Sequence, residues 1–240
     1  MMGPLDSLWT LGPSKGAQVA FFSWSALVLC FVDRMTISVA LIPLAEAHGW
    51  TASTQGLILS AFFYGYMCLQ IPAGILAKRY TGRKILGAAV AGWSLATMLT
   101  PVASATLPLL LGVRLVMGML EGMSFPAVHD LCARSFPPET RAGYTSLIGS
   151  GINIGMIAGF ACSPLVAVDW TLIFYAPGAL GLMWTLIYLR CCPTPEEALN
   201  KYNHVEGLSC SAVSPATNGE VNNETTTEEP PGTSLRPILL

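Results

Sequence analysis

The stretch VLCFVDRMTISVALI, residues 28–42, is an apolar run with an aspartate and an arginine side by side in its middle. With the apolar residues on either side it is long enough for a helix that crosses a bilayer, which needs about 20 residues. A charge near the bilayer centre costs at least about 2.5–3.5 kcal/mol, so it normally faces a partner or an aqueous cavity. The stretch therefore predicts a transmembrane helix whose Asp33 and Arg34 point away from lipid.

The composition of the whole chain indicates the same class of protein. Its 240 residues are 52% hydrophobic and only 11% charged, with a mean hydropathy of +0.56, whereas soluble domains carry about 25% charged residues. The apolar stretches do not alternate with period two, which disfavours a membrane β-barrel. A net charge of −2 gives no basic footprint for nucleic acid. The seven cysteines form neither CxxC pairs nor zinc-type groupings with histidine, so no disulfide framework or metal site is expected.

Six apolar stretches, separated by Gly, Pro and polar breakers, are predicted to span the membrane. They cover about residues 18–45, 55–77, 85–104, 107–131, 144–168 and 170–190. A short N-terminus (1–17) thus precedes a six-span transmembrane bundle (18–192). Residues 193–240 are rich in Ser, Thr, Asn, Glu and Pro, and they are expected to form a disordered tail or central loop. The predicted fold class is an all-α polytopic membrane protein.

Lysine and arginine are distributed asymmetrically among the loops. Ten of the twelve lie before the first span, in the second–third and fourth–fifth loops, or after the sixth span. The loops on the opposite side carry only acidic residues and histidine. Because positive charge accumulates on the cytoplasmic side, both termini of this integral multi-pass protein are predicted to be cytoplasmic, with the organelle left open.

Further charges lie in the fourth predicted span. Arg114 and Glu121 are seven residues apart and so share one helix face, and Gly118 between them leaves that face open. His129 follows beyond a kink expected at Pro126. Arginine suits phosphate or carboxylate, and a carboxyl group in an apolar setting can bind and release a proton. Two alternatives stay open: the arginines only lock helices by pairing with carboxylates, and the histidine is merely an interfacial polar residue.

The spans also show a weak internal correspondence. The first and fourth each carry an arginine, and the second and fifth each end with a proline. A three-span offset of this kind is what a 3+3 inverted repeat leaves in a sequence. The fifth span contains a ridge of glycines that predicts close helix packing: Gly151, Gly155 and Gly159.

Several strings resemble the major facilitator superfamily. GILAKRYTGRK (74–84) is similar to its signature between the second and third spans, and RLVMG (114–118) to its Arg-x-x-x-Gly. FFYGY (62–66), QIPAG (70–74) and EGMSFPA (121–127) resemble the anion:cation symporters. That branch includes sodium–phosphate, vesicular glutamate, sialic acid and plant-type phosphate transporters. Within it, these strings resemble the plant-type phosphate members most. The resemblance covers about residues 18–192 and implies the N-terminal six-helix bundle of a twelve-span fold.

The resemblance also implies roles for individual residues. Anion binding would fall on Arg34 and Arg114, and proton coupling on Glu121. The histidine that follows Phe-Pro-Ala corresponds to His129, for which we also expect a role in proton or cation coupling. The family's aromatic residue at the inner end of FFYGY corresponds to Tyr64 or Tyr66, for which we expect a role in substrate binding. For Asp33 we expect a role as the counterion of the neighbouring arginine or as part of the cation path.

The predicted conformational loop comprises Gly74, Lys78, Arg79, Gly82 and Arg83. Here Lys78 stands where the superfamily pattern has an acidic residue. This departure puts in doubt the conformational latch that the acidic residue would form. Leu59 stands where vesicular glutamate members have a histidine, which argues against a glutamate carrier.

The predicted function is a secondary transporter of inorganic phosphate or an organic anion, coupled to H⁺ or Na⁺ by alternating access. No GxxxxGK[ST] motif appears, no cofactor is expected, and the absence of catalytic motifs indicates that the chain is not an enzyme. Because such carriers bind substrate between two bundles, transport would need a homodimer or a missing C-terminal half. The apolar SLRPILL (234–240) favours an incomplete chain. The alternative is a truncated, non-transporting half that assembles with or regulates another carrier.

Overall fold

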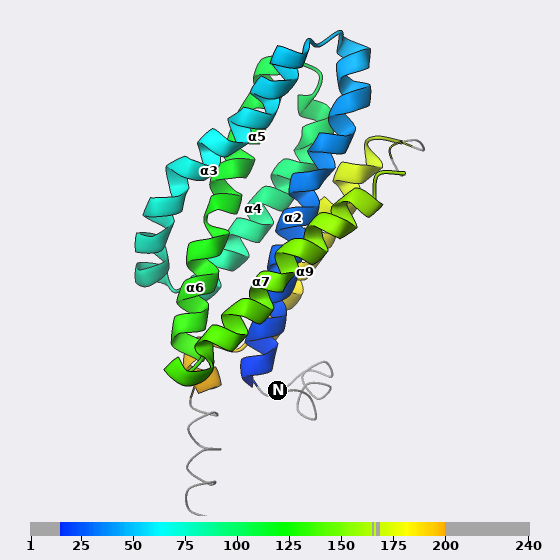
Figure 1. The fold of residues 1–240 in the computed structure, drawn as a ribbon. Coiled ribbons are helices and arrows are strands. Elements are labelled where there is room, and N and C mark those ends of the chain that lie inside the picture. Colours follow the sequence, from blue (N-terminus) through cyan, green and yellow to red (C-terminus); the bar gives the residue numbers. More distant parts are fainter. Residues whose placement is uncertain (1–14, 165, 167–168, 200–240) are drawn as a thin grey trace, which may run out of the picture.

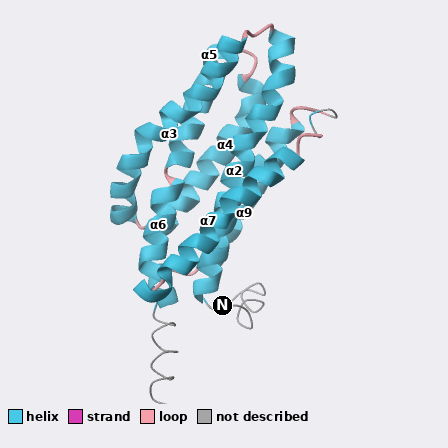
Figure 2. Ribbon diagram, viewed as in Figure 1, coloured by secondary structure: helices cyan, strands magenta, loops and turns pink. Residues whose placement is uncertain are grey.

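The computed structural model describes residues 15–164, 166 and 169–199, and its regular structure is helical throughout these ranges (Figures 1 and 2). The helices are α2 (Lys15–His48), α3 (Ala52–Tyr80), α4 (Gly82–Ala103), α5 (Leu107–Gly122), α6 (Ser124–Ser135), α7 (Pro138–Ala161) and α9 (Leu172–Cys191). The predicted all-α fold class is confirmed.

Five helical segments of the described chain are long and apolar enough to cross a membrane: α2, α3, α4, the consecutive pair α5–α6, and α9. Helix α7 has 24 residues and, at about 1.5 Å per residue, a length of about 36 Å, which is also sufficient. Its glycines, serines and asparagine make it less apolar than the others. The helix order thus follows the six predicted spans, with α7 as the least apolar of them.

The pairing of the helices follows the predicted repeat. The most extensive contacts join α3 with α5, α2 with α7, and α4 with α9 (Figure 1). Suppose that the repeat superposes α2, α3 and α4 on α5–α6, α7 and α9, respectively. The α3–α5 pair then corresponds to the α7–α2 pair, and the α4–α9 pair corresponds to itself. The helix contacts therefore have the pattern expected of a 3+3 inverted repeat.

Glycines allow two of these pairs to approach closely. The ridge on α7 lies against α2: a Cβ added at Gly151 would lie 2.7 Å from the carbonyl oxygen of Trp24, and one at Gly155 would lie 2.5 Å from that of Val28. On α5, a Cβ at Gly118 would overlap the carbonyl oxygen of Phe62 on α3. The ridge predicted for the fifth span is therefore a packing surface.

Two differences between the predicted spans and the structure have a proline as their cause. The fourth span breaks at Met123, between α5 and α6, and not at Pro126. Proline lacks an N–H and its ring clashes with the carbonyl four residues earlier, so the effect of Pro126 appears at Gly122. Helix α7 ends at Ala161, ahead of the predicted residue 168, because a proline follows shortly after its end at position 164.

The segment that follows α9 contacts the N-terminus of α2. Residues 195–199 form a helical turn within the segment predicted to be a tail, and Glu197 pairs with Lys15 at 3.3 Å. Ala198 of this turn is buried. Most of the predicted N-terminus and of the predicted tail, residues 1–14 and 200–240, lies outside the described residues.

Candidate functional site

An ion pair joins α2 and α5 in the middle of the bundle. Nη2 of Arg34 lies 3.1 Å and Nε 3.4 Å from Oε2 of Glu121, whose side chain is fully buried. The thiol of Cys30, one helical turn before the arginine, donates to the same oxygen at 3.3 Å. The other oxygen, Oε1, has no hydrogen-bond partner among the described residues. The carboxylate therefore retains an open acceptor position inside the protein.

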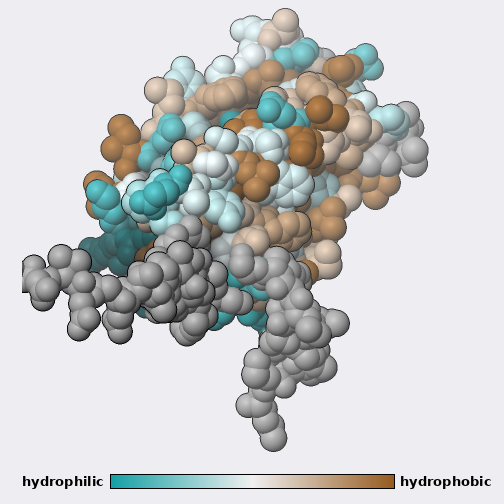
Figure 3. Space-filling model, turned by 60° about the horizontal axis from the view of Figure 1, so that its bottom comes forward, coloured by the Kyte–Doolittle hydropathy of each residue, from teal (hydrophilic) through white to brown (hydrophobic). Residues whose placement is uncertain are grey.

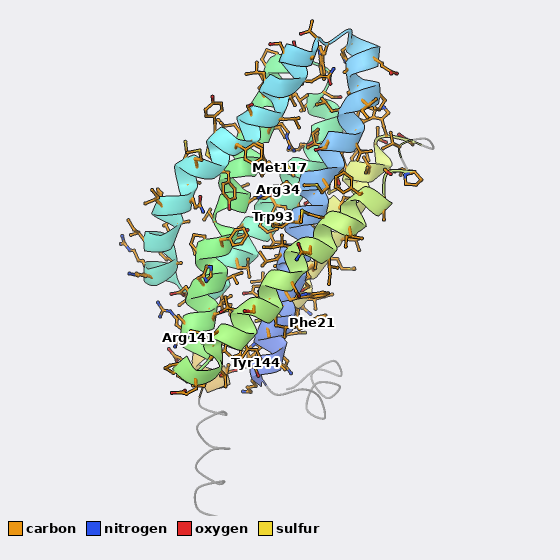
Figure 4. The ribbon with its side chains drawn as sticks, viewed as in Figure 1. Phe21, Arg34, Trp93, Met117, Arg141 and Tyr144 are labelled. Atoms are coloured by element: carbon orange, nitrogen blue, oxygen red, sulfur yellow. The ribbon has the colours of Figure 1, made fainter. Side chains whose placement is uncertain are left out.

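Three aromatic rings surround the Arg34 guanidinium. Its Cζ lies 4.7 Å from the ring centre of Phe31, 4.9 Å from that of Phe62 and 5.0 Å from that of Tyr66. Such cation–π contacts stabilise a cation where water is scarce. The string FFYGY thus supplies two of the three rings, and Figure 4 shows Arg34 near the centre of the bundle.

The structure distinguishes the two tyrosines that were candidates for the family's aromatic position. Tyr66 lies beside Arg34, whereas Tyr64 is 65% exposed on the outer side of α3. Residues two apart on a helix are separated by about 200°, so both cannot face the same neighbour. Only Tyr66 belongs to the cluster.

Arg114 contacts the same Phe62 ring from α5. Its Cζ is 5.1 Å from the ring centre of Phe62, so the guanidinium carbons of Arg34 and Arg114 are within about 10 Å of each other. Arg114 is 2% exposed, and its Nη1 lies 3.3 Å from the sulfur of Met117. Its Nε has no partner and it forms no ion pair within the described part of the chain. A buried cation without a paired anion is energetically unfavourable, so this position favours the entry of an anion.

Asp33 faces a different helix from its neighbour. Its side chain is buried, Oδ2 accepts a hydrogen bond from Thr97 of α4 at 3.4 Å, and Oδ1 has no partner among the described residues. Adjacent helical residues point about 100° apart, which separates Asp33 from Arg34. The predicted counterion role is therefore filled by Glu121, while a role of Asp33 in the cation path stays a prediction.

His129 is exposed on α6, beyond the break in the fourth span. Across the described ranges, no hydrogen bond or ion pair joins it to the charged cluster. Its proposed coupling role stays a prediction without support from a contact.

The predicted conformational loop connects α3, α4 and α6. The N–H of Gly82, at the start of α4, donates to Oδ2 of Asp130 at 2.8 Å. Arg134 binds both oxygens of that carboxylate at 2.9 and 3.0 Å, and it donates to the carbonyl of Lys78 at 3.3 Å. The loop itself carries Lys78 in place of the acidic residue of the superfamily pattern. Asp130 of α6 provides a carboxylate that contacts the loop. Thr81 adopts φ 72°, a left-handed conformation that reverses the chain between the two helices.

Arg83 connects the same loop to α9. It donates to the carbonyls of Leu189 and Cys192 at 2.8 and 3.1 Å, where the helix leaves its last carbonyls unpaired. Arg79 instead lies over the ring of Tyr80 at 5.5 Å, and a Cβ at Gly74 would contact nothing within 4 Å. Of the predicted loop residues, Lys78, Gly82 and Arg83 hold helices together in this structure.

Sequence reasoning missed several partners of the charged residues. They are Cys30, Phe31, Phe62, Thr97 and Asp130. Cys30 and Phe31 precede Arg34 by four and three residues, the helical spacing that indicates a shared face. No comparable signal identifies partners on other helices.

Comparison with known proteins identifies the family and the fold of the chain. The family model described as Major Facilitator Superfamily matches residues 23–230. The chain is 37% identical over 175 residues to the chloroplastic ascorbate transporter of Arabidopsis thaliana, covering 72% of this chain and 32% of that protein. It is 39% identical over 174 residues to the chloroplastic sodium-dependent phosphate transport protein 1 of the same plant, covering 71% and 34%.

A rice relative, the chloroplastic probable anion transporter 4 of Oryza sativa subsp. japonica, is 38% identical over 201 residues, covering 80% of this chain and 34% of the relative. The chain therefore spans about a third of the length of the curated relatives it matches.

Among solved structures, a bacterial homologue of the human lysosomal transporter Spinster, in an inward-facing and occupied conformation, superposes with a TM-score of 0.69 at 21% identity. The superposition covers 75% of this chain and 44% of that one. At this identity the likeness concerns the fold alone. The family model, the helix order and the motifs agree, and the chain belongs to the major facilitator superfamily.

Proposed function

We propose that the chain forms the N-terminal half of a secondary active anion transporter, whose substrate is inorganic phosphate or an organic anion. The observation that carries the proposal is the pair of guanidinium groups on opposite helices, Arg34 and Arg114, within about 10 Å of each other at the ring of Phe62. Two planar cations in a dry setting match the geometry of phosphate and carboxylate. The relatives named as phosphate, ascorbate and anion transporters support the substrate class.

The ion pair offers a route to proton coupling. While Glu121 is ionised, Arg34 is held by its Oε2 at 3.1 Å. A proton on the carboxylate removes that negative charge, and Arg34 then binds a substrate anion instead. Anion binding and protonation of Glu121 thus favour each other, which is the linkage that H⁺ symport requires. Coupling to Na⁺ would instead use the unpartnered Oδ1 of Asp33.

Alternating access requires a second bundle, because the substrate of such carriers lies between two halves. Large apolar residues are exposed on α3 and α7, among them Met67, Ile71, Ile75 and Ile157 at 70–80%. We propose that some of this surface contacts either a C-terminal half or a second copy of the chain, and that both termini face the cytoplasm. The alternative proposal is a non-transporting half that assembles with or regulates another carrier.

The first test is the apparent mass of the native product, detected with an antibody against residues 193–240. A band at about twice the 25.5 kDa of this chain leads to uptake assays on the full carrier; a band at that mass leads to crosslinking for a homodimer. Uptake of labelled phosphate and ascorbate into proteoliposomes under a pH or Na⁺ gradient then tests the function. If neither the native product nor its dimer takes up any anion, the transport proposal is wrong.

A further inference from the structure

A cavity of about 420 Å³ lies at the end of the bundle that carries the loop between α3 and α4. It is formed by the α3–α4 turn, the start of α4, the last turn of α6 and the helical turn at 195–199. Its polar lining consists of Thr81, Arg83, Lys84, Arg134, Thr194 and Glu196. Figure 3 brings this end of the molecule forward and shows hydrophilic residues gathered on one side of it. The cavity is separate from the cluster at Arg34, which lies mid-bundle (Figure 4).

The lining carries three cationic side chains and one acidic one. Both guanidinium groups are already fixed in place: Arg83 by two carbonyls at the C-terminal end of α9, and Arg134 by Asp130 and the carbonyl of Lys78. In each of them Nη1 has no hydrogen-bond acceptor among the described residues, and the same holds for Nζ of Lys84. Cations held in place in this way lose little conformational freedom when they bind an anion.

The start of α4 adds a second favourable contribution. Thr81 makes no side-chain cap at the first turn of this 22-residue helix, and it lines the cavity. N–H groups and the helix dipole at such an end attract anions. One of those N–H groups, that of Gly82, is taken by Asp130.

We infer that this cavity binds a phosphate group, supplied by the headgroup of an anionic phospholipid or by soluble phosphate. Arginine and lysine are the side chains that recognise phosphate. Basic pockets between transmembrane helices on the cytoplasmic side, where we propose that this end lies, are suited to anionic headgroups. A phosphate bound there would connect α4 and α6 to the 195–199 turn. The segment after α9 would then be tied to the bundle through this site as well as through the pair between Lys15 and Glu197.

The test is native mass spectrometry of the purified 240-residue chain in detergent, titrated with phosphatidylglycerol, phosphatidylcholine or inorganic phosphate. Lys84→Gln removes an exposed cation from the lining, with Arg79→Gln as the matched control outside it. Loss of one contact is expected to weaken binding about five-fold. Glu196→Gln should strengthen binding by a similar factor, whereas Glu139→Gln, outside the cavity, should not. Circular dichroism confirms that each variant is folded.

The outcomes separate the two sources of phosphate. Preference for phosphatidylglycerol over phosphatidylcholine, sensitive to Lys84→Gln and Glu196→Gln only, supports a lipid site. Saturable binding of inorganic phosphate with the same sensitivity, without a lipid preference, supports a soluble ligand. The inference is overturned if neither binds above the phosphatidylcholine level. It is also overturned if Lys84→Gln has no effect, or if Arg79→Gln weakens binding equally, since binding would then reflect diffuse charge.

Discussion

Replacing Gly118 by alanine tests the close crossing of α3 and α5 that positions the candidate site. The added Cβ would overlap the carbonyl oxygen of Phe62 and lie 3.0 Å from the nitrogen of Tyr66. Ordinary contacts begin at 3.4 Å, so α3 must withdraw by at least 0.4 Å at Tyr66, and further at Phe62. Both atoms are backbone and cannot move aside alone. Overpacking of this kind lowers the free energy of unfolding by about 1–3 kcal/mol.

Gly112 provides the matched control on the same helix. A Cβ there would contact nothing within 4 Å, so Gly112→Ala should gain about 0.8–1.0 kcal/mol from helix propensity. Gly118→Ala gains the same helix propensity, so the two variants should differ by the overpacking cost, about 1–3 kcal/mol, in SDS unfolding followed by circular dichroism. Anion uptake should also fall in Gly118→Ala, because the rings of Phe62 and Tyr66 contact Arg34. Equal stability of the two variants would refute the close approach of the helices.

Three further predictions concern charged residues. Arg114→Ala in the native carrier should abolish anion uptake without lowering the amount of carrier in the membrane. Arg190 is exposed at the end of α9, and the control Arg190→Ala should leave uptake unchanged. Normal uptake by Arg114→Ala would rule out the arginine pair as the anion site. Glu121→Gln should make uptake independent of the pH gradient, because its side chain can no longer gain or lose a proton, and a retained pH dependence would move proton coupling to another residue. Asp130→Ala should lower stability in SDS unfolding by about 1–3 kcal/mol, since it leaves the N–H of Gly82 without its acceptor; an unchanged midpoint would show that water replaces the carboxylate.

Hydropathy and breakers were sufficient to predict the helices, because a bilayer-spanning segment has to satisfy its backbone hydrogen bonds internally and to be apolar along its length. The exact ends were harder to predict. Pro126 was the correct cause of the break in the fourth span, but a proline acts on the carbonyl four residues before it, which places the break at Met123.

The candidate site was predicted in part. Helical spacing correctly placed Arg114 and Glu121 on one face, and both are buried. Spacing along one helix cannot show which residue of another helix lies opposite, so the pair between Glu121 and Arg34 became visible only in the structure. Asp33 was assigned to Arg34 because the two are neighbours in sequence, yet neighbouring residues on a helix point in different directions.

The crossed pairing of α2 with α7 and of α3 with α5 has a consequence for biosynthesis. A ribosome delivers α2, α3 and α4 first, but the principal partner of each belongs to the second set of three helices. The first three helices therefore enter the bilayer before their principal partner helices exist. Their main contacts can form only after α5, α7 and α9 have been synthesised. Assembly of the bundle is consequently a late event, and a nascent chain stopped after α4 contains inserted helices but no core.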